Sequence, residues 1–326
     1  YFTNVSDNDS LGILTLSVSV SNHGVKATVR GEVPTGTYSV IRTEDEDGRV
    51  QFDFFDMYDR LVLSRRVTHD GKRMEKYDTY FVYRNQDRLA AIFPPAASDE
   101  FRANQSMDAD LLARYAYLYE YDVKGRLIAK KLPGCDWTSM CYDKADRLVL
   151  VQDGVARRKN NCHFTIYDIF GRECLKGSCS FWSELPKNID DYVVCKYTGN
   201  SPDCYGYVVS GLSVSPAGIR SADYYDHYYF LQDGLFPSSS SYQYVSAKGY
   251  AEKSSVAKSF HTGQVRCELV DDGIMCETLY YDHQGRLCQS HSSTHLGTYE
   301  HRYYSYNFLG QPLSVRTSFD GGRNYV

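Results

Sequence analysis

A short motif that recurs along the chain constrains its fold more than any other feature. Its clearest copies read Tyr-Asp-x-x-Gly-Arg-Leu; seven of the eight copies open with an aromatic residue, and seven, not all the same ones, carry Arg at the sixth place. The copies lie at 44–49, 55–61, 83–89, 121–127, 142–148, 167–172, 281–287 and 306–311. A unit that returns this often indicates a supersecondary structure repeated along the chain.

Turn chemistry explains the letters of the motif. An Asp at the start of a type I turn accepts hydrogen bonds from the N–H groups of the turn itself. The residue three places later takes left-handed backbone geometry and forms a bulge with the returning strand, which favours Gly, Asn or Asp. The residues at that place are Gly48, Asp59, Asp87, Gly125, Asp146, Gly171, Gly285 and Gly310. Each copy is therefore predicted to be the turn of a β-hairpin.

The acids and arginines of the motif are interpreted as structural. A residue repeated at every turn serves every turn, so Asp is expected to be the turn acceptor and Arg the cross-strand partner of a neighbouring hairpin's acid. A sugar-binding or catalytic role for these carboxylates is the alternative. The residues assigned to the structural turn motif are Asp56, Asp59, Asp87, Tyr121, Asp122, Gly125, Arg126, Tyr142, Asp143, Asp146, Arg147, Tyr167, Asp168, Gly171, Arg172, Tyr281, Asp282, Gly285, Arg286, Tyr306 and Gly310.

Tyrosine is the dominant aromatic residue, with 30 copies beside 15 Phe and 2 Trp. Before one turn, the tyrosines of 115–121 alternate with other residues at strand period, which favours a packed ladder on one face of a sheet. Exposed tyrosines can instead bind glycans, because the ring offers an apolar face and a polar tip. The candidate ligand surface outside the repeats is the cluster Tyr224, Tyr225, Tyr228 and Tyr229.

These residues resemble the RHS or YD-repeat family, in the variety found in large predicted surface proteins of Bacteroidetes. Besides the motif, the stretches Lys-Leu-Pro-Gly-Cys (131–135), Ala-Asp-Tyr-Tyr-Asp (222–226) and His-Leu-Gly (295–297) are similar to that group. The resemblance implies hairpins that spiral side by side into a curved sheet, which in complete members closes into a hollow shell around a cargo. It also implies a bacterial extracellular or cell-surface location, with neighbouring repeats or cargo of a parent chain as partners. Asp-Pro, found in the family's self-cleavage motif, is absent from the sequence.

The sequence divides into four segments. An N-terminal β-hairpin region (1–37) precedes a YD-repeat sheet (38–177) with an insertion at about 91–114, in which Ser106 is expected to cap a helix over 108–114. A β-rich insertion or small subdomain (178–265) contains a helix-compatible stretch at 247–260. Repeats close the chain (266–326). Because the sequence opens with Tyr1 and has no signal peptide, it is expected to be a piece of a longer protein.

Charge and hydropathy exclude some classes of partner. The net charge is −5, which does not favour a nucleic-acid groove. No apolar run approaches the length of about 18 residues that a membrane helix needs. Motifs for nucleotides, phosphates, zinc proteases and serine hydrolases are missing, so neither a cofactor nor an enzymatic activity is predicted.

Cysteine and histidine spacings leave few metal or disulfide candidates. No Cys-x-x-Cys occurs among the ten cysteines, which disfavours a zinc site. Cys267 and Cys276 flank Asp271-Asp272, and Cys195 and Cys204 flank 199–202, so either pair can face across a hairpin and form a disulfide, or remain buried thiols. His291 and His295 stand four residues apart with His301 beyond, but they lie where two hairpins join, which does not favour a metal pair.

The sequence therefore predicts an all-β protein of consecutive antiparallel β-hairpin repeats, which form a curved, twisted sheet with a mostly β insertion. The expected function is a non-enzymatic structural or interaction segment of a YD-repeat surface or secreted protein. The alternative is a carbohydrate- or protein-binding module that uses exposed tyrosines.

Overall fold

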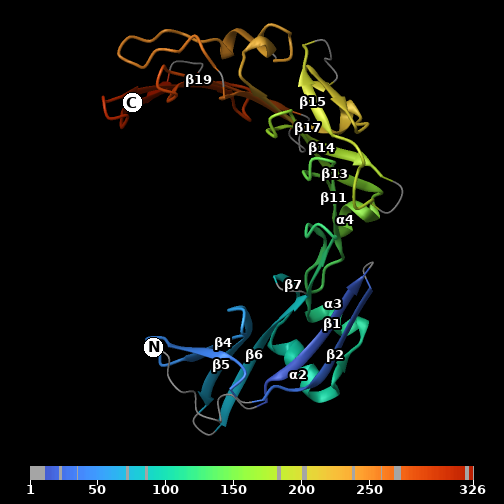
Figure 1. Cartoon of the computed structure of the whole chain (residues 1–326). Helices are drawn as coiled ribbons and strands as arrows, with labels where there is room; N and C mark the ends of the chain where they lie inside the picture. The colour runs from blue at the N-terminus through green and yellow to red at the C-terminus, as the bar shows by residue number, and fades with distance from the viewer. Residues whose placement is uncertain are drawn as a thin grey trace. The chain divides into compact units, whose positions relative to one another are not determined.

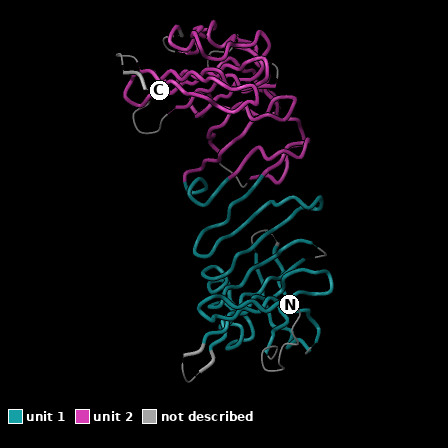
Figure 2. Tube along the Cα trace, turned by 90° about the vertical axis from the view of Figure 1, so that its left-hand side faces the viewer, with its two compact units in different colours: residues 1–140, 152–158 teal, residues 141–151, 159–326 magenta. Residues whose placement is uncertain are grey.

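The structure is a computed structural model of the chain. It describes residues 12–21, 24–34, 36–70, 73–84, 87–181, 185–199, 204–236, 239–257, 259–267, 273–319 and 323–325. Within these ranges, the all-β class and the succession of antiparallel hairpins are confirmed (Figure 1). The chain forms two compact units, residues 1–140 with 152–158 and residues 141–151 with 159–326, called unit 1 and unit 2 (Figure 2).

The described residues of unit 1 form two sheets and three short helices. Its strands are β1 (Leu14–Ser21), β2 (Gly24–Glu32), β3 (Ser39–Glu44), β4 (Val50–Phe55), β5 (Leu61–Asp70), β6 (Arg73–Arg84), β7 (Arg88–Phe93), β8 (Ser106–Met107), β9 (Tyr117–Tyr121), β10 (Leu127–Lys131) and β11 (Thr138–Tyr142). Its helices are α2 (Pro95–Asn104), α3 (Ala109–Tyr115) and α4 (Gly154–Arg158).

Strands β3 to β7 of unit 1 pair antiparallel in chain order, and β7, β9, β10 and β11 continue the same sheet. The predicted N-terminal hairpin is β1 with β2, although residues 22–23 of its turn lie outside the described residues. This hairpin takes β8 as a third strand. A buried core that includes Phe54, Leu63 and Phe101 lies between these elements.

Helix α3 of the first insertion has its N-cap two residues after the predicted cap. Its N-cap is Asp108, whose carboxylate accepts a hydrogen bond from the Leu111 N–H at 2.8 Å. The prediction that Ser106 caps this helix is wrong, because Ser106 lies in β8 and pairs with Thr28. Helix α2, which the sequence analysis did not predict, begins with a Pro in its first turn, where the absent N–H of proline costs no hydrogen bond.

Unit 2 continues the hairpin pattern with longer connections. Its strands are β12 (Leu148–Gln152), β13 (Asn161–Tyr167), β14 (Glu173–Ser180), β15 (Val194–Tyr197), β16 (Tyr207–Ser210), β17 (Ile219–Tyr225), β18 (His261–Cys267), β19 (Ile274–Tyr281), β20 (Leu287–Ser293), β21 (Tyr299–Tyr306), β22 (Pro312–Phe319) and β23 (Arg323–Tyr325). Its 3₁₀ turns are η2 (Pro216–Gly218), η3 (Tyr229–Leu231) and η4 (Ser239–Tyr242).

The main sheet of unit 2 continues directly from β14 to β17, although β15 and β16 separate these strands in sequence. Strand β14 pairs with β17, so the sheet continues from β13 and β14 to β17–β23. Strands β15 and β16 form a hairpin that joins β13 through one parallel pair, Tyr167 with Val194. Buried aromatic and aliphatic residues such as Phe164, Leu175 and Tyr224 form a second core. Strand β17 ends at Tyr225, and the 3₁₀ turn η3 follows at Tyr229–Leu231.

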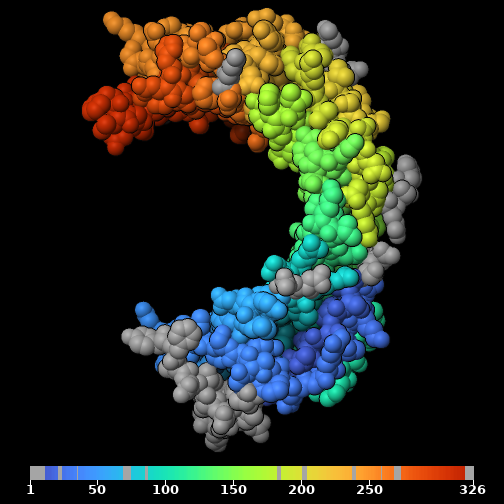
Figure 3. Space-filling model, viewed as in Figure 1, coloured from blue at the N-terminus to red at the C-terminus, as the bar shows by residue number. Residues whose placement is uncertain are grey.

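Residues 239–257 lie over strands β19–β21, as Figures 1 and 3 show in orange above red. The N–H groups of Ala251 and Ser254 donate to the carbonyls of Tyr304 and Tyr281, and the Gln289 amide donates to the Val245 carbonyl at 2.5 Å. The described residues of 247–260 contain no helix, so the predicted helix there is wrong. These residues satisfy their backbone groups on the sheet instead of along a helix axis.

The boundary between the two units falls inside the predicted segment 38–177. The division of the sequence into four segments stays a prediction about its organisation.

Candidate functional site

The repeated turn is the best-defined constellation of polar residues in the chain. In the copy at 121–127, the Asp122 N–H donates to the Arg126 carbonyl at 3.0 Å, and the Gly125 N–H donates to the Asp122 carbonyl at 3.1 Å. The same two bonds form in the turns that begin at Asp45, Asp56, Asp143, Asp168, Asp282 and Asn307.

The bulge position of these turns has left-handed backbone geometry. In the seven turns that the structure describes in full, φ there lies between 59° at Asp59 and 91° at Gly125. Residues 85–86, in the turn that contains Asp87, lie outside the described residues. These φ values are those that the turn chemistry requires, and they explain why only Gly and Asp occur at this place.

Each Asp side chain uses its two oxygens differently. Oδ1 of Asp143 accepts from the N–H groups of Ala145 and Arg147, both at 2.9 Å. Oδ2 accepts from the guanidinium of Arg147, at 3.0 Å from Nε and 2.6 Å from Nη2. The Asp143 side chain is fully buried and that of Arg147 is only 17% exposed. Equivalent Asp–Arg pairs occur at Asp56–Arg60, Asp122–Arg126, Asp168–Arg172 and Asp282–Arg286.

The pairing of the motif arginine was predicted wrongly. The expected partner was an acid of a neighbouring hairpin, whereas the arginine pairs with the Asp of its own turn, four residues earlier. Arg172 does both, because its Nη2 also donates to Asp226 Oδ2 at 2.7 Å. The four-residue spacing favours the local pair, since the bulged turn brings both side chains to the same side of the hairpin end.

The arginine also reaches the next turn. Nη1 of Arg147 donates to the carbonyl of Asp168 at 3.1 Å, and Nη1 of Arg286 donates to the carbonyl of Asn307 at 3.4 Å. In unit 1, Arg88 donates in the same way to the carbonyl of Asp122 at 3.0 Å. One guanidinium therefore closes its own turn and holds the following one.

The motif tyrosine makes a hydrogen bond in the opposite direction, back to the strand that follows the previous turn. The Tyr167 hydroxyl donates to the Leu148 carbonyl at 2.9 Å, and the Tyr306 hydroxyl donates to the Leu287 carbonyl at 2.7 Å. In both cases the acceptor follows the arginine of the previous turn. The Tyr225 hydroxyl donates to the carbonyl of Glu173, which follows Arg172, at 3.0 Å.

The same tyrosine rings lie under the arginine that they follow. The distance from the guanidinium carbon to the ring centroid is 5.3 Å for Arg147 and Tyr167, and 4.5 Å for both Arg172–Tyr225 and Arg286–Tyr306. These distances are within the range of cation–π contacts. We call the combination of an arginine that holds the next turn and a tyrosine that bonds back to the previous one a turn clamp. Among the described residues of unit 2, three pairs form a clamp: Arg147–Tyr167, Arg286–Tyr306, and Arg172–Tyr225, in which Arg172 reaches the Asp226 side chain instead of a carbonyl.

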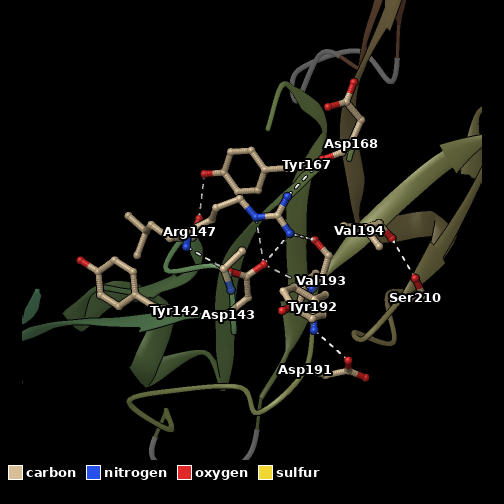
Figure 4. Close-up of polar contacts among 12 residues, drawn as sticks. Tyr142, Asp143, Arg147, Tyr167, Asp168, Asp191, Tyr192, Val193, Val194 and Ser210 are labelled. Carbon is tan, nitrogen blue, oxygen red and sulfur yellow. Dashed lines mark hydrogen bonds and ion pairs between the residues drawn. The ribbon is translucent and has the colours of Figure 1, made fainter. Parts of the chain in front are cut away.

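The insertion of unit 2 is fastened to one of these turns (Figure 4). Nη2 of Arg147 donates to the Val193 carbonyl at 3.0 Å, and the Val193 N–H donates to Asp143 Oδ2 at 3.3 Å. The Lys144 N–H donates to the Asp191 carbonyl at 3.0 Å, so the irregular segment that leads into β15 lies against the motif. The turn residues thus also position a segment about fifty residues away in sequence.

The pKa values of the motif Asp residues are consistent with this geometry. Burial alone would raise the pKa of Asp143, but hydrogen bonds from the side chain and backbone of Arg147, together with its charge, outweigh burial and hold that pKa below its usual value. Asp56, Asp122 and Asp282 have lowered pKa values through the same balance between burial and their own arginines. These carboxylates are ionised acceptors at neutral pH.

The predicted ligand surface is largely buried. Tyr224 is fully buried, and its hydroxyl donates to the Tyr205 carbonyl at 3.1 Å. The hydroxyls of Tyr225 and Tyr228 donate to backbone carbonyls, and both rings are partly buried. Only Tyr229 of the four is exposed, at 62%. Of the candidate ligand surface, one exposed ring therefore remains, because β17 directs Tyr224 into the core.

Neither predicted cysteine pair faces across a hairpin. Cys267 lies opposite Ile274 and Cys276 opposite Val265, while Cys195 lies opposite Val209. Residues 268–272, which include Asp271-Asp272, lie outside the described residues. All ten cysteines lie within the described ranges, and none is in a disulfide.

His291 has a partner that its spacing did not indicate. It is buried in β20 opposite His301 in β21, with 2.6 Å between the two Nδ1 atoms. Among the described residues, no group of three or more His, Cys, Asp or Glu is arranged to hold a metal ion. No described helix is long and apolar enough to cross a membrane.

Comparison with known proteins gives remote structural likenesses only. No family model and no curated protein matches the chain. It is similar to a solved structure described as "Crystal Structure of TcdB2-TccC3", with a TM-score of 0.47, 12% identity and coverage of 96% of this chain and 15% of that one. A second, "Crystal Structure of TcdB2-TccC3-Cdc42", gives a TM-score of 0.48, 12% identity and coverage of 95% and 15%. The chain thus spans about 15% of the length of either structure, and its family and function are matters of proposal.

Proposed function

We propose that this chain is a non-enzymatic structural segment of a bacterial YD-repeat surface or secreted protein, in which clamped hairpins form part of the wall of a shell or scaffold. The observation that carries the proposal is the turn clamp. The motif Asp, Arg and Tyr side chains are engaged with their own turn and the adjacent ones, as at Asp143, Arg147 and Tyr167. A contact that one hairpin makes with the next suits an array that extends by adding hairpins.

The burial of the motif Asp–Arg pairs suits a structural wall better than a catalytic site. The Asp–Arg pairs of the strong motif copies are mostly buried, and each carboxylate already accepts backbone and guanidinium hydrogen bonds. A nucleophilic or acid–base carboxylate must instead reach a substrate. The partners that this function implies are neighbouring repeats and an enclosed or displayed part of the parent chain.

The test uses the parent polypeptide with the sequences that adjoin this segment. We expect limited proteolysis to leave the wall intact, and to cut it at 141–326 once Arg147→Ala and Arg286→Ala open two clamps. Arg49→Ala is the matched control, because Arg49 sits in the weakest motif copy and its side chain is 70% exposed. Wild-type resistance in the double clamp variant would contradict the proposal. Protection of adjoining sequences in the wild type would favour enclosure, and their cleavage would favour display.

A binding module is the second candidate, and one observation favours it. The exposed ring of Tyr229 stacks on His227 with 5.1 Å between ring centroids and 22° between their planes. An exposed ring stacked on a half-buried one suits a sugar face. A glycan screen with Tyr229→Ala tests this role. Tyr58→Ala, which removes an exposed ring of unit 1, is the control, and binding unaffected by Tyr229→Ala would reject the site.

A further inference from the structure

Two cysteines of unit 2 face each other across neighbouring strands. Cys162 in β13 lies directly opposite Cys179 in β14, and their Sγ atoms are 3.2 Å apart. Directly opposed residues of antiparallel strands have Cα atoms about 4.5–5.5 Å apart, which is within the range that a disulfide spans. Only a small side-chain movement separates this pair from the S–S bond length of about 2.0 Å.

The two thiols differ in access. Cys162 is fully buried, whereas Cys179 is partly exposed. A second close pair in the same unit, Cys174 and Cys195, is buried on both sides. A small oxidant in solution can therefore reach Cys179 but neither member of the other pair.

The hydrogen bond between the thiols sets the order of reaction. It lowers the pKa of Cys179 against the opposing effect of burial. The same bond, together with burial, raises the pKa of Cys162. The accessible sulfur is thus also the one that more readily becomes the thiolate, which is the nucleophile of thiol–disulfide exchange.

We propose that Cys162 and Cys179 are a redox-active thiol pair, which a low-molecular-weight disulfide such as oxidised glutathione converts to a cross-strand disulfide. The bond would lock β13 to β14 around the turn at 168–172. The inference stands on the register of these strands and is independent of the proposed function. An oxidising compartment would supply the co-reactant.

The reaction balances in two exchanges. The Cys179 thiolate attacks one sulfur of oxidised glutathione, forms a mixed disulfide and releases one glutathione thiolate. Cys162 then loses its proton, attacks Cys179 Sγ and expels the second glutathione thiolate. Two electrons pass from the protein thiols to glutathione disulfide, and the two thiol protons end on the two released glutathiones.

The experiment maps the thiols by mass spectrometry. The reduced chain is equilibrated in buffers of rising oxidised-to-reduced glutathione ratio, quenched in acid, denatured, alkylated with N-ethylmaleimide and digested with trypsin. Cleavage after Lys159, Arg172, Lys176 and Lys187 puts Cys162, Cys174 and Cys179 on three different peptides. We expect the peptides 160–172 and 177–187 to lose their adducts together and to appear as one cross-linked species.

Variants separate the steps. Cys162→Ser should trap the mixed disulfide on Cys179, and Cys179→Ser should leave Cys162 fully alkylated. Cys267→Ser, which leaves the pair untouched, should cross-link like the wild type. Oxidised wild type should also melt at a higher temperature than reduced wild type, and Cys179→Ser should lose this difference.

Three results would overturn the proposal. The first is a cross-link from Cys162 to its other thiol neighbour, Cys141. The second is a mixed disulfide on Cys179 of the wild type that never resolves. The third is full alkylation of both cysteines at ratios where the exposed Cys135 is already modified.

Discussion

At the scale of single residues, the motif arginine joins three backbone segments. Arg147 contacts Asp143 in its own turn, the carbonyl of Asp168 in the next, and the carbonyl of Val193 in the insertion. Removing it leaves a buried carboxylate without its counter-charge, which costs more than the loss of an exposed ion pair.

Arg147→Ala should therefore lower the free energy of unfolding by about 3 kcal/mol. Arg49→Ala should change it by less than about 0.5 kcal/mol, because its ion pairs are exposed. Urea unfolding followed by circular dichroism measures both. Equal midpoints for the two variants would show that the buried pair does not stabilise its turn.

The glycines at the bulge position differ in the space that is available for a side chain. A Cβ at Gly125 would lie 2.5 Å from Nη2 of Arg88, whereas a Cβ at Gly48 has no neighbour within 4 Å. Both positions have positive φ, so Val is strained at either. Gly48→Val should cost about 1 kcal/mol for the backbone alone, and Gly125→Val about 2 kcal/mol, because it also displaces Arg88 from the Asp122 carbonyl. Thermal unfolding compares the two, and an unchanged melting temperature for Gly125→Val would contradict the bulged turn.

His291 makes unit 2 sensitive to acid. Burial, followed by the positive charge of His301, lowers its pKa to about 4 from an ordinary value of 6.5. Above pH 6.5 the folded and unfolded chains are both neutral at this site. Between pH 6.5 and 4 only the unfolded chain gains the proton, so stability should fall by about 3 kcal/mol over that interval.

Unfolding measured at pH 7 and pH 4.5 tests this loss. His291→Gln should remove most of the difference, whereas His163→Gln, at an exposed position of β13, should keep it. The lowered pKa values of Asp56, Asp122, Asp143 and Asp282 add a separate loss, which begins as the pH falls below about 4 and continues to their depressed values.

At the scale of elements, the clamp predicts coupling between neighbouring hairpins. Arg286→Ala and Tyr306→Ala should be non-additive in a double-mutant cycle by about 0.5–1 kcal/mol, because each removes the same ring–guanidinium contact. Arg147→Ala with Tyr306→Ala is the matched pair that belongs to different clamps. The unfolding free-energy changes of these two substitutions should add. A coupling energy as large as that of Arg286 and Tyr306 would mean that the non-additivity comes from general loss of structure and not from the clamp.

The hairpins and their turns were predictable because their signals are local. An Asp, a Gly and an Arg at fixed spacing specify a bulged turn whatever the rest of the chain does. The partners of Arg286 and Tyr306 were not predictable, since they are backbone carbonyls of other turns and leave no mark in the sequence. The arginine and the turn that it holds are 21 residues apart at Arg147–Asp168 and Arg286–Asn307, but 34 apart at Arg88–Asp122, so the spacing is an incomplete signal.

Two features of unit 2 escaped the sequence analysis for different physical reasons. The stretch 247–260 has helical propensity but bonds its backbone to β19–β21, so tertiary contacts override a weak local preference. The pairing of Cys162 with Cys179 depends on the predicted bulge next to the turn, which shifts the register of β13 against β14 between Ile166 and Tyr167. A one-residue bulge decides which side chains face each other, so the pair can be assigned only when the turn and its bulge are both placed.

At the scale of the whole molecule, each unit has its own buried core, and burial differs from strand to strand. In unit 2, β14 has neighbours on both sides and buries Cys174 and Leu175. Strand β22 also has neighbours on both sides, but none of its residues is buried. In a repeat array, stability is approximately a sum of unit and neighbour contributions, so strands with equal hydrogen bonding can open at different free energies.

Amide hydrogen exchange should therefore be at least about tenfold faster in β22 than in β14. Both strands are hydrogen-bonded on two sides, so the comparison isolates burial from backbone pairing. Arg286→Ala should speed exchange in β20–β22 and leave β14 unchanged, because its clamp holds only the last turns. Uniform exchange across unit 2, with every strand responding alike to Arg286→Ala, would mean that the hairpins open as one cooperative block. The view that each clamp stabilises only its neighbouring hairpins would then be wrong.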